Sequence, residues 1–212
     1  MSKQCEFGLQ TFEELDEAAA VMTRAYQDYD YITLYFTDTE ERRNGLLVFM
    51  KCVLRTIFGK ANLLAAHQDG KLVAQATLEQ PGFKKPSALQ YIMHGFWRVF
   101  FTVNWKRMNG FLTMDEGAGK PCHDYQKSGP DIWYLSMLEV DPPAQGQGVG
   151  TQFLAYMEDY VRQRGGKQLA LFTNSEENLA FYTKRGYEVF HECEIEHDGR
   201  KIGSWSMKKM VK

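Results

Sequence analysis

The sequence predicts a single mixed α/β (α+β) domain, on three observations. The chain has 212 residues, which is within the usual size of one domain. Hydrophobic residues make up 44% and charged residues 25%, as in an ordinary globular protein. The expected elements run in the order helices, hairpin, strand, helix, strand, helix, hairpin. We therefore expect one domain over residues 1–212.

The first sixty residues predict two helices. After a short apolar run at Phe7–Leu9, Thr11 and Glu14 form a capping box that starts the first helix. Its apolar face recurs at helical spacing, in Leu15, Ala18, Ala19, Met22 and Tyr26. The second helix should begin at Asp38 or Thr39 and bury Leu46, Leu47, Met50, Val53, Leu54 and Ile57.

The middle of the chain begins with a hairpin. Residues 62–67 and 71–79 are expected to be strands joined at Asp69-Gly70, a strong signal for a two-residue turn. After the breaks at Pro81-Gly82 and Pro86, an apolar helix is expected from about Leu89 to Met108. The residues up to 130 then predict an irregular loop, because they include Gly117, Gly119, Pro121, Gly129 and Pro130.

From residue 131 the pattern alternates between strands and helices. Ile132–Val140 has the composition of a buried strand, and a glycine-rich turn leads from it into a helix that ends near Arg164. A strand at 168–173 and a helix ending at Gly186 follow, with Gly186 placed for a left-handed helix cap. Two strands that turn at Asp198-Gly199 complete the expected sheet.

Charge and cysteine content exclude several classes of partner. The 25 basic and 27 acidic residues give a net charge of −2, so no nucleic-acid or membrane partner is expected. The four cysteines form no CxxC pair, and no metal site is expected. The N-terminus lacks the apolar core of a signal peptide, and the most apolar stretch is too short to span a membrane. We expect a cytoplasmic protein.

The turn between the strand ending at Val140 and the next helix carries the chemistry. Its alternate glycines, Gly146, Gly148 and Gly150, let backbone N–H groups approach an anion at a helix N-terminus. A diphosphate is the natural ligand. A P-loop is excluded because no Gly-Lys-Ser/Thr follows, and the dinucleotide fingerprint requires a different glycine spacing.

Two motifs carry a family resemblance. Gln145-x-x-Gly148-x-Gly150 resembles the Q/R-x-x-G-x-G/A signature of the GCN5-related N-acetyltransferase (GNAT) superfamily. The segment from Asn178 through Phe181-Tyr182 to Gly186 resembles its second signature, N-x-x-F-Y-x-x-x-G-F. The order and spacing, with the strand that begins near Trp133, resemble the puromycin N-acetyltransferase branch.

The resemblance implies a GNAT fold, a mixed central sheet with helices on both faces and a V-shaped splay between its two central parallel strands. Acetyl-CoA would lie in the splay as co-substrate, with its pantetheine arm paired to backbone groups of Leu138, Glu139 and Val140. Its pyrophosphate would be held by the N–H groups of Gln145, Gly146, Gln147, Gly148, Val149, Gly150 and Thr151. Asn178 would contact the same arm, and Tyr182 would give a proton to the leaving thiolate. As alternatives, Asn178 could stabilise the first helical turn, and Tyr182 could pack beside Phe181.

The general base is left open among several side chains. Glu139 is the first candidate, although it could instead lie in solvent at the strand end, and the others are Tyr134, Ser136, Tyr29 and His123. His123 is expected in an irregular loop. Tyr29 and Tyr134 are also expected to contact the acceptor, in a pocket built from the N-terminal helices and residues 80–130. The candidate aromatic liners are Tyr26, Tyr29, Tyr31, Tyr35, Trp97 and Trp133.

The expected function is transfer of an acetyl group from acetyl-CoA to the primary amine of a small molecule, by direct attack of the amine. The alternative is a non-catalytic acyl-CoA sensor on the same fold, and a protein acetyltransferase ranks lower. The edge of the terminal hairpin could pair with a second chain to form a homodimer.

Overall fold

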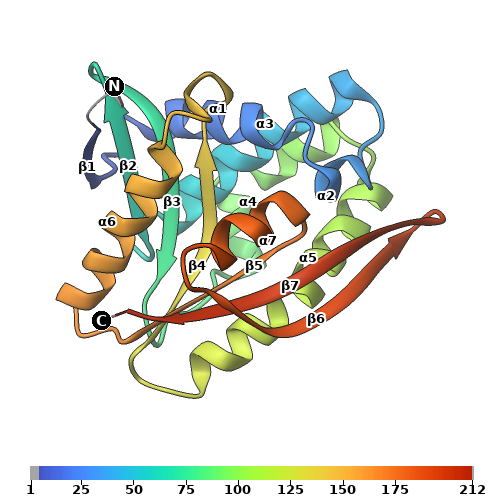
Figure 1. Ribbon diagram of the computed structural model, residues 1–212. Helices are drawn as coiled ribbons and strands as arrows, with labels where there is room; N and C mark the ends of the chain where they lie inside the picture. Colours follow the sequence, from blue (N-terminus) through green and yellow to red (C-terminus); the bar gives the residue numbers. More distant parts are fainter. Residues whose placement is uncertain (1–4, 212) are drawn as a thin grey trace.

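The computed structural model describes residues 5–211, which form one mixed α/β domain (Figure 1). Residues 1–4 and 212, the ends of the predicted domain, lie outside the described residues. The described chain has one seven-stranded sheet in the order β1-β2-β3-β4-β5-β7-β6, and only β4 and β5 pair in parallel. The strands are β1 (Glu6–Leu9), β2 (Asn62–Gln68), β3 (Lys71–Glu79), β4 (Ile132–Val140), β5 (Gln168–Thr173), β6 (Glu188–His197) and β7 (Arg200–Met210).

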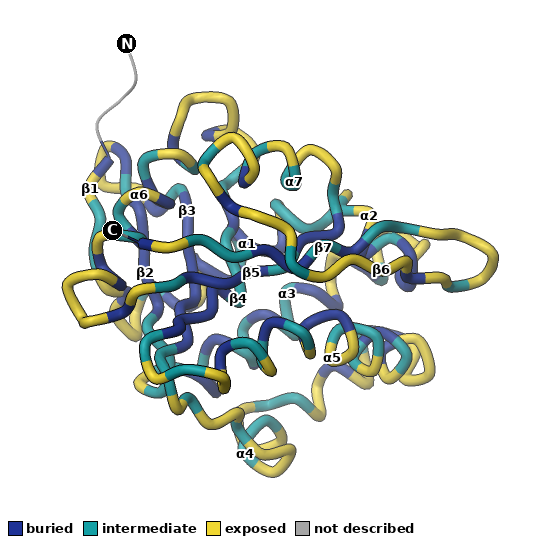
Figure 2. The backbone as a smooth tube through the Cα atoms, turned by 60° about the horizontal axis from the view of Figure 1, so that its bottom comes forward, coloured by how far each residue is buried: buried dark blue, intermediate teal, exposed yellow. Residues whose placement is uncertain are grey.

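Helices cover both faces of the sheet, as predicted. One apolar core lies under α1 (Leu15–Tyr26), α2 (Asp30–Thr33), α3 (Thr39–Ile57) and α5 (Trp105–Lys127). A second core lies on the other face, under α6 (Val149–Gln163) and α7 (Glu176–Thr183). Figure 2 shows the buried central strands between these layers, with exposed residues gathered in the outer loops.

Local sequence signals explain several element boundaries. Both Asp-Gly pairs adopt positive φ at each residue, 52° and 74° at Asp69-Gly70 and 49° and 76° at Asp198-Gly199, as a two-residue hairpin turn requires. Gly186 has φ 84° after α7, which confirms the predicted left-handed cap.

The prediction for residues 80–130 is wrong in most of its length. The expected helix from Leu89 to Met108 is divided into α4 (Ala88–Met93), a 3-10 helix at Phe96–Phe101 and the start of α5. The expected loop is instead the body of α5, which includes Gly117, Gly119 and Pro121.

Packing against the sheet explains why α5 tolerates these residues. Its buried side recurs at helical spacing, in Met108, Phe111, Ala118, Cys122 and Gln126. Pro121 lacks an N–H, so it deprives only the carbonyl of Gly117 of its helical partner, and Gly117 is exposed to water. A Cβ at Gly119 would lie 3.5 Å from Phe172 and 3.6 Å from the Tyr134 hydroxyl, so the small residue brings α5 close to β4 and β5.

Phe153 tests the core under α6. It is fully buried and stacks on Phe7 at 5.6 Å between ring centroids. Phe153→Ala should lower the free energy of unfolding by about 3–5 kcal/mol, measured by urea denaturation, because it removes buried area and leaves a cavity. Phe101→Ala, at a side chain that is 83% exposed, should change it by less than about 1 kcal/mol. Equal losses in the two variants would contradict this assignment of the core.

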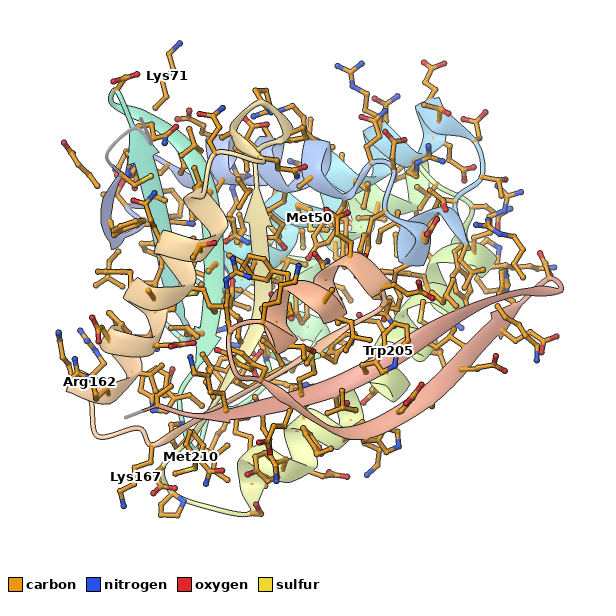
Figure 3. All side chains as sticks on the ribbon, viewed as in Figure 1. Met50, Lys71, Arg162, Lys167, Trp205 and Met210 are labelled. Carbon is orange, nitrogen blue, oxygen red and sulfur yellow. The ribbon has the colours of Figure 1, made fainter. Side chains whose placement is uncertain are left out.

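The surface carries dispersed charge. Lys71 and Lys167 project outward from opposite ends of the sheet (Figure 3). The edge strand β6, which the predicted homodimer would use, exposes Glu188, Glu192 and Glu194, and such charges oppose pairing of two copies. The dimer therefore stays a prediction. Among the helices of residues 5–211, none has the length and apolar content needed to span a membrane.

Candidate active site

The strands β4 and β5 separate halfway along β4. They pair at Ile132, Trp133 and Tyr134, opposite Gln168, Leu169 and Ala170, and not beyond. Leu135 to Val140 therefore have no partner on the side of β5, which confirms the expected V-shaped splay. On the side of β3, the register shifts so that Ser136 is an extra residue in β4, a bulge that bends the strand where the splay begins.

The glycine turn leads directly from the splay to the N-terminus of α6. Gly146 and Gly148 have φ of 72° and 82°, and Gly148 is the N-cap without a side-chain hydrogen bond to the helix. The N–H groups in the first turn of α6 have no intrahelical acceptors. Gln145 Nε2 donates to the Val140 carbonyl at 3.0 Å and so holds the turn against β4. These are the properties of an anion site.

Arg185 is a candidate binding residue that sequence analysis missed. Its guanidinium hydrogen-bonds Thr151 Oγ1 in the first turn of α6, donates to the Phe181 carbonyl at 2.6 Å, and lies 3.6 Å above the Phe181 ring. Its Nε is buried without a hydrogen-bond partner in the described structure. The guanidinium adds positive potential beside the N-terminus of α6. In the sequence, the position of Arg185 directly before Gly186 of the second motif could have indicated this residue.

Glu139 is buried rather than exposed at the end of the strand, so that alternative is wrong. It is 3% exposed, and the Gln75 side-chain amide donates to its Oε2. Its Oε1 is buried and has no hydrogen-bond partner among the described residues. Burial raises the pKa of Glu139 to about 7, a shift that hydrogen bonds from Tyr26 and Gln75 oppose.

Tyr182 lies near Glu139 and is 8% exposed. Burial raises the pKa of the Tyr182 hydroxyl, and the nearby Tyr29 and Glu139 raise it further. Ser175 caps α7 by accepting the Asn178 N–H at 3.4 Å, so the Asn178 side chain is not needed as the cap.

Tyr29 is tethered to the end of β5. Its hydroxyl accepts the Asn174 N–H at 3.1 Å and lies 3.3 Å from Thr173 Oγ1. The fold thus brings Tyr29, Glu139 and Tyr182, from three separate parts of the chain, to the same splay.

Tyr134 and His123 lie together on the side of α5. Tyr134 is 2% exposed, and its ring meets the His123 ring edge-on at 4.7 Å. His123 lies within α5, so the expected irregular loop is wrong there. Burial, with Lys85 and Lys127, lowers the pKa of His123 to about 4, so the imidazole is neutral at pH 7.

The candidate acceptor liners are only partly brought together. The rings of Tyr26, Tyr29 and Tyr31 contact one another in sequence, on the face of the sheet that α1, α2, α3 and α5 cover. Trp133 packs in the opposite core, beside Tyr160, and does not reach them.

The two remaining candidate liners of the acceptor pocket, Tyr35 and Trp97, have other neighbours. The ring of Tyr35 stacks on that of His197, with 3.9 Å between the ring centroids. Trp97 is 49% exposed, beside Phe101, in a segment that forms a 3-10 helix instead of part of the predicted apolar helix.

Glu79, on β3 opposite Tyr134, is a second buried carboxylate that sequence analysis missed. Burial raises the pKa of Glu79 to about 7, and Ser136 and Lys85 oppose the shift. His123 Nδ1 lies 3.9 Å from its Oε2. In the described part of the chain, no three His, Cys, Asp or Glu side chains are grouped to hold a metal ion.

Comparisons with known proteins place the chain among acetyltransferases. A family model described as Acetyltransferase (GNAT) family matches residues 54–187. A segment of 62 residues is 41% identical to aminoalkylphosphonate N-acetyltransferase of Salmonella typhimurium, and covers 28% of this chain and 40% of that protein. The match thus spans less than half the length of this curated relative.

Solved structures share the fold at low sequence identity. The chain is similar to histone acetyltransferase HPA2 and related acetyltransferase from Corynebacterium glutamicum (TM-score 0.63, 16% identity, 99% of this chain and 96% of that one). It is also similar to ribosomal-protein-alanine N-acetyltransferase from Brucella melitensis (TM-score 0.58, 15% identity, 97% and 99%). Since the family model matches more than half of its residues, and its splayed sheet and glycine turn agree with that fold, the chain belongs to the GNAT acetyltransferase family.

Proposed function

We propose that this protein is a cytoplasmic enzyme that transfers an acetyl group from acetyl-CoA to the primary amine of a small molecule. The observation that carries the proposal is the buried carboxylate of Glu139 near the Tyr182 hydroxyl, in a splay that opens toward an uncapped helix N-terminus. A buried carboxylate without a full set of partners is costly, so its retention in such a place favours a chemical role.

The residues of the splay suit acetyl-CoA. The unpaired edge of β4 at Leu138, Glu139 and Val140 can pair with the amides of the pantetheine arm, although the Val140 carbonyl already accepts from Gln145. The N–H groups from Gln145 to Thr151 can hold the pyrophosphate. Arg185 adds a positive charge beside it, and Asn178, in the first turn of α7, is proposed to contact the arm.

The side chains then supply the proton transfers. Acetyl-CoA brings the thioester. Glu139 accepts the proton of the acceptor ammonium, and the freed amine forms the new C–N bond as the C–S bond breaks. A backbone N–H of β4 stabilises the negative charge on the acetyl oxygen. Tyr182 donates its proton to the departing sulfur, and its phenolate then takes the second proton that the amine nitrogen loses as the amide forms. Glu139 suits this step because its pKa of about 7 lies close to the working pH.

A small acceptor agrees with the curated relative, whose name specifies an aminoalkylphosphonate. Tyr29 and Tyr134, on the face of the sheet that α5 covers, are proposed to contact the acceptor. The puromycin N-acetyltransferase branch stays a prediction from the motifs.

Ligand-induced stabilisation tests acetyl-CoA binding. Acetyl-CoA at about 100 times its Kd should stabilise the fold by about 2.7 kcal/mol, which raises Tm by about 5 °C or more in a thermal melt. Gly148→Val should abolish the shift, because a side chain at the N-cap obstructs the N–H groups of the helix. Gly199→Val is the matched control, since it also forces a side chain to positive φ (76° against 82°), at the distant β6–β7 turn.

The two functions give different results in this experiment. An enzyme shows the shift and releases free CoA with some primary amines, whereas a non-catalytic sensor shows the shift and releases none. No shift at millimolar acetyl-CoA would refute both.

A further inference from the structure

Strand β3 carries a row of polar side chains where a buried central strand usually has apolar ones. Gln75, Thr77 and Glu79 alternate along it, so they point to the same face, and they are 0%, 1% and 8% exposed. We call these three residues the polar stripe. Its first member is opposite Glu139 on β4, and its last is opposite Tyr134, where β4 and β5 begin to separate.

The polar stripe contains buried oxygen atoms that have no hydrogen-bond partner among the described residues. Thr77 Oγ1 and Glu79 Oε2 are buried and accept no hydrogen bond in the described structure, and the same holds for Oε1 of the neighbouring Glu139. Buried polar atoms are nearly always hydrogen-bonded, so three exceptions on two paired strands need an explanation. All three are oxygens and two belong to carboxylates, which together call for a ligand rich in N–H donors.

The surrounding charges also favour a cation. Asp115 on α5 is a further, partly buried acid, held by a 2.9 Å hydrogen bond from the Tyr31 hydroxyl, and desolvation raises its pKa. His123, beside Glu79, is neutral at pH 7 because burial lowers its pKa to about 4. Lys85 lowers the pKa of both Glu79 and Asp115 by its positive charge, and its side chain is exposed. A protonated amine offers three N–H donors and no acceptor, which matches this environment.

We propose that the acceptor is a linear diamine or polyamine, whose second ammonium group binds Glu79 while the first reacts beside Glu139. This inference rests on the proposed function. Gln75, opposite Glu139, and Glu79 are four residues apart, about 13 Å along a strand at about 3.3 Å per residue. Glu139, beside the first residue of the polar stripe, and Glu79, its last residue, are therefore separated along the strands. An extended chain with an amino group at each end matches that spacing better than a compact amine. An acceptor with a phosphonate or carboxylate in place of the second amine would bring a negative charge toward Glu79 and Asp115.

The test compares acceptors that differ in one group. Release of CoA from acetyl-CoA is measured with linear diamines of increasing length, with the monoamines of the same length, and with an aminoalkylphosphonate. The best diamine should exceed its matched monoamine by about ten-fold or more in kcat/KM, chiefly through a lower KM, because its second ammonium forms a charge-assisted hydrogen bond with Glu79 that the monoamine cannot form. The aminoalkylphosphonate should be the poorest acceptor.

Two variants locate the effect. Glu79→Gln keeps the shape of the side chain and should reduce the preference for the diamine to about two-fold or less. Glu116→Gln removes one negative charge from the exposed side of α5, next to Asp115, and should keep the preference. Loss of the preference in both variants would mean that general charge attraction, not the polar stripe, selects the diamine.

The outcomes separate the inference from the proposed function. Equal kcat/KM for diamine and monoamine overturns the polar stripe as a diamine site and leaves the acetyltransferase intact. An aminoalkylphosphonate that outperforms both overturns it in the same way. If acetyl-CoA gives no thermal shift and no amine releases CoA, the proposed function itself fails.

Discussion

Glu139→Gln should lower kcat/KM for the acceptor amine by about 10²–10⁴-fold, the usual contribution of a positioned general base. The amide keeps the shape of the carboxylate and can still accept the hydrogen bond from Gln75, but it cannot take a proton from the ammonium. Acetyl-CoA should raise Tm equally in the variant and the parent, because the backbone of β4 and the turn before α6 are unchanged.

The pH profile identifies Glu139 as the group responsible. With a monoamine acceptor, which removes any contribution of Glu79, kcat/KM of the parent should rise with pH and level off above the Glu139 pKa of about 7. This rise should be absent in Glu139→Gln. A variant that retains the same rise would show that another group is the base.

Stability provides a control with a defined sign. Between its ordinary pKa of 4.5 and the folded value of about 7, Glu139 holds a proton in the folded protein that the unfolded chain has released. The stability contribution of this group therefore falls as pH rises through that window and stays low above it. Glutamine has no charge to bury, so Glu139→Gln should unfold at the same Tm as the parent or higher at pH 8. A large loss of Tm would instead assign Glu139 a structural role.

The half of the fold that surrounds the splay was predictable from local signals. The β4 strand, the glycine turn and α6 are specified by a composition change, glycine spacing and an amphipathic face, and each is realised within a few residues. The turns at Asp69-Gly70 and Asp198-Gly199 depend on a positive φ that these residues adopt at low cost. Such signals do not depend on distant contacts.

The prediction for residues 80–130 failed because the structure of this segment depends on distant contacts. Gly117, Gly119 and Pro121 are poor helix formers, and propensity alone predicts a loop. Tertiary packing overrides it, because α5 buries one side against β4, β5 and β7, and Gly119 lies close enough to β4 and β5 that a Cβ there would already contact Phe172. No local pattern contains that information.

The burial of the acidic residues in the site also depends on distant contacts. Glu139 is an isolated charge in an apolar strand and Glu79 ends a strand of mixed polarity. The sequence does not say whether such a residue lies in solvent or in a core. The alternation of Gln75, Thr77 and Glu79 was visible, but its meaning depends on the packing of α1 over β3, which the sequence does not reveal. Arg185 contacts Thr151 across 34 residues of sequence, which no local pattern shows.

The control for Tyr182 comes from the same motif. Tyr187 is buried, its ring lies 5.5 Å from that of Tyr182, and burial likewise raises its pKa. Its hydroxyl, however, is hydrogen-bonded to Glu158 at 3.1 Å, away from Glu139 and Tyr29. Tyr187→Phe should therefore keep kcat within about two-fold of the parent, since no reacting atom depends on that hydroxyl.

Tyr182→Phe should lower kcat by about 10–10²-fold and leave the acetyl-CoA thermal shift unchanged. The effect should be smaller than for Glu139→Gln, because a thiol with a pKa of about 8.5 is already a fair leaving group without a proton donor. The raised pKa of Tyr182 keeps its hydroxyl protonated up to high pH, so the donor is available wherever Glu139 is ionised. A loss confined to Tyr182→Phe supports proton donation to the sulfur. If Tyr182→Phe and Tyr187→Phe lose activity equally, both hydroxyls act through the packing of α7, and Tyr182 has no catalytic role.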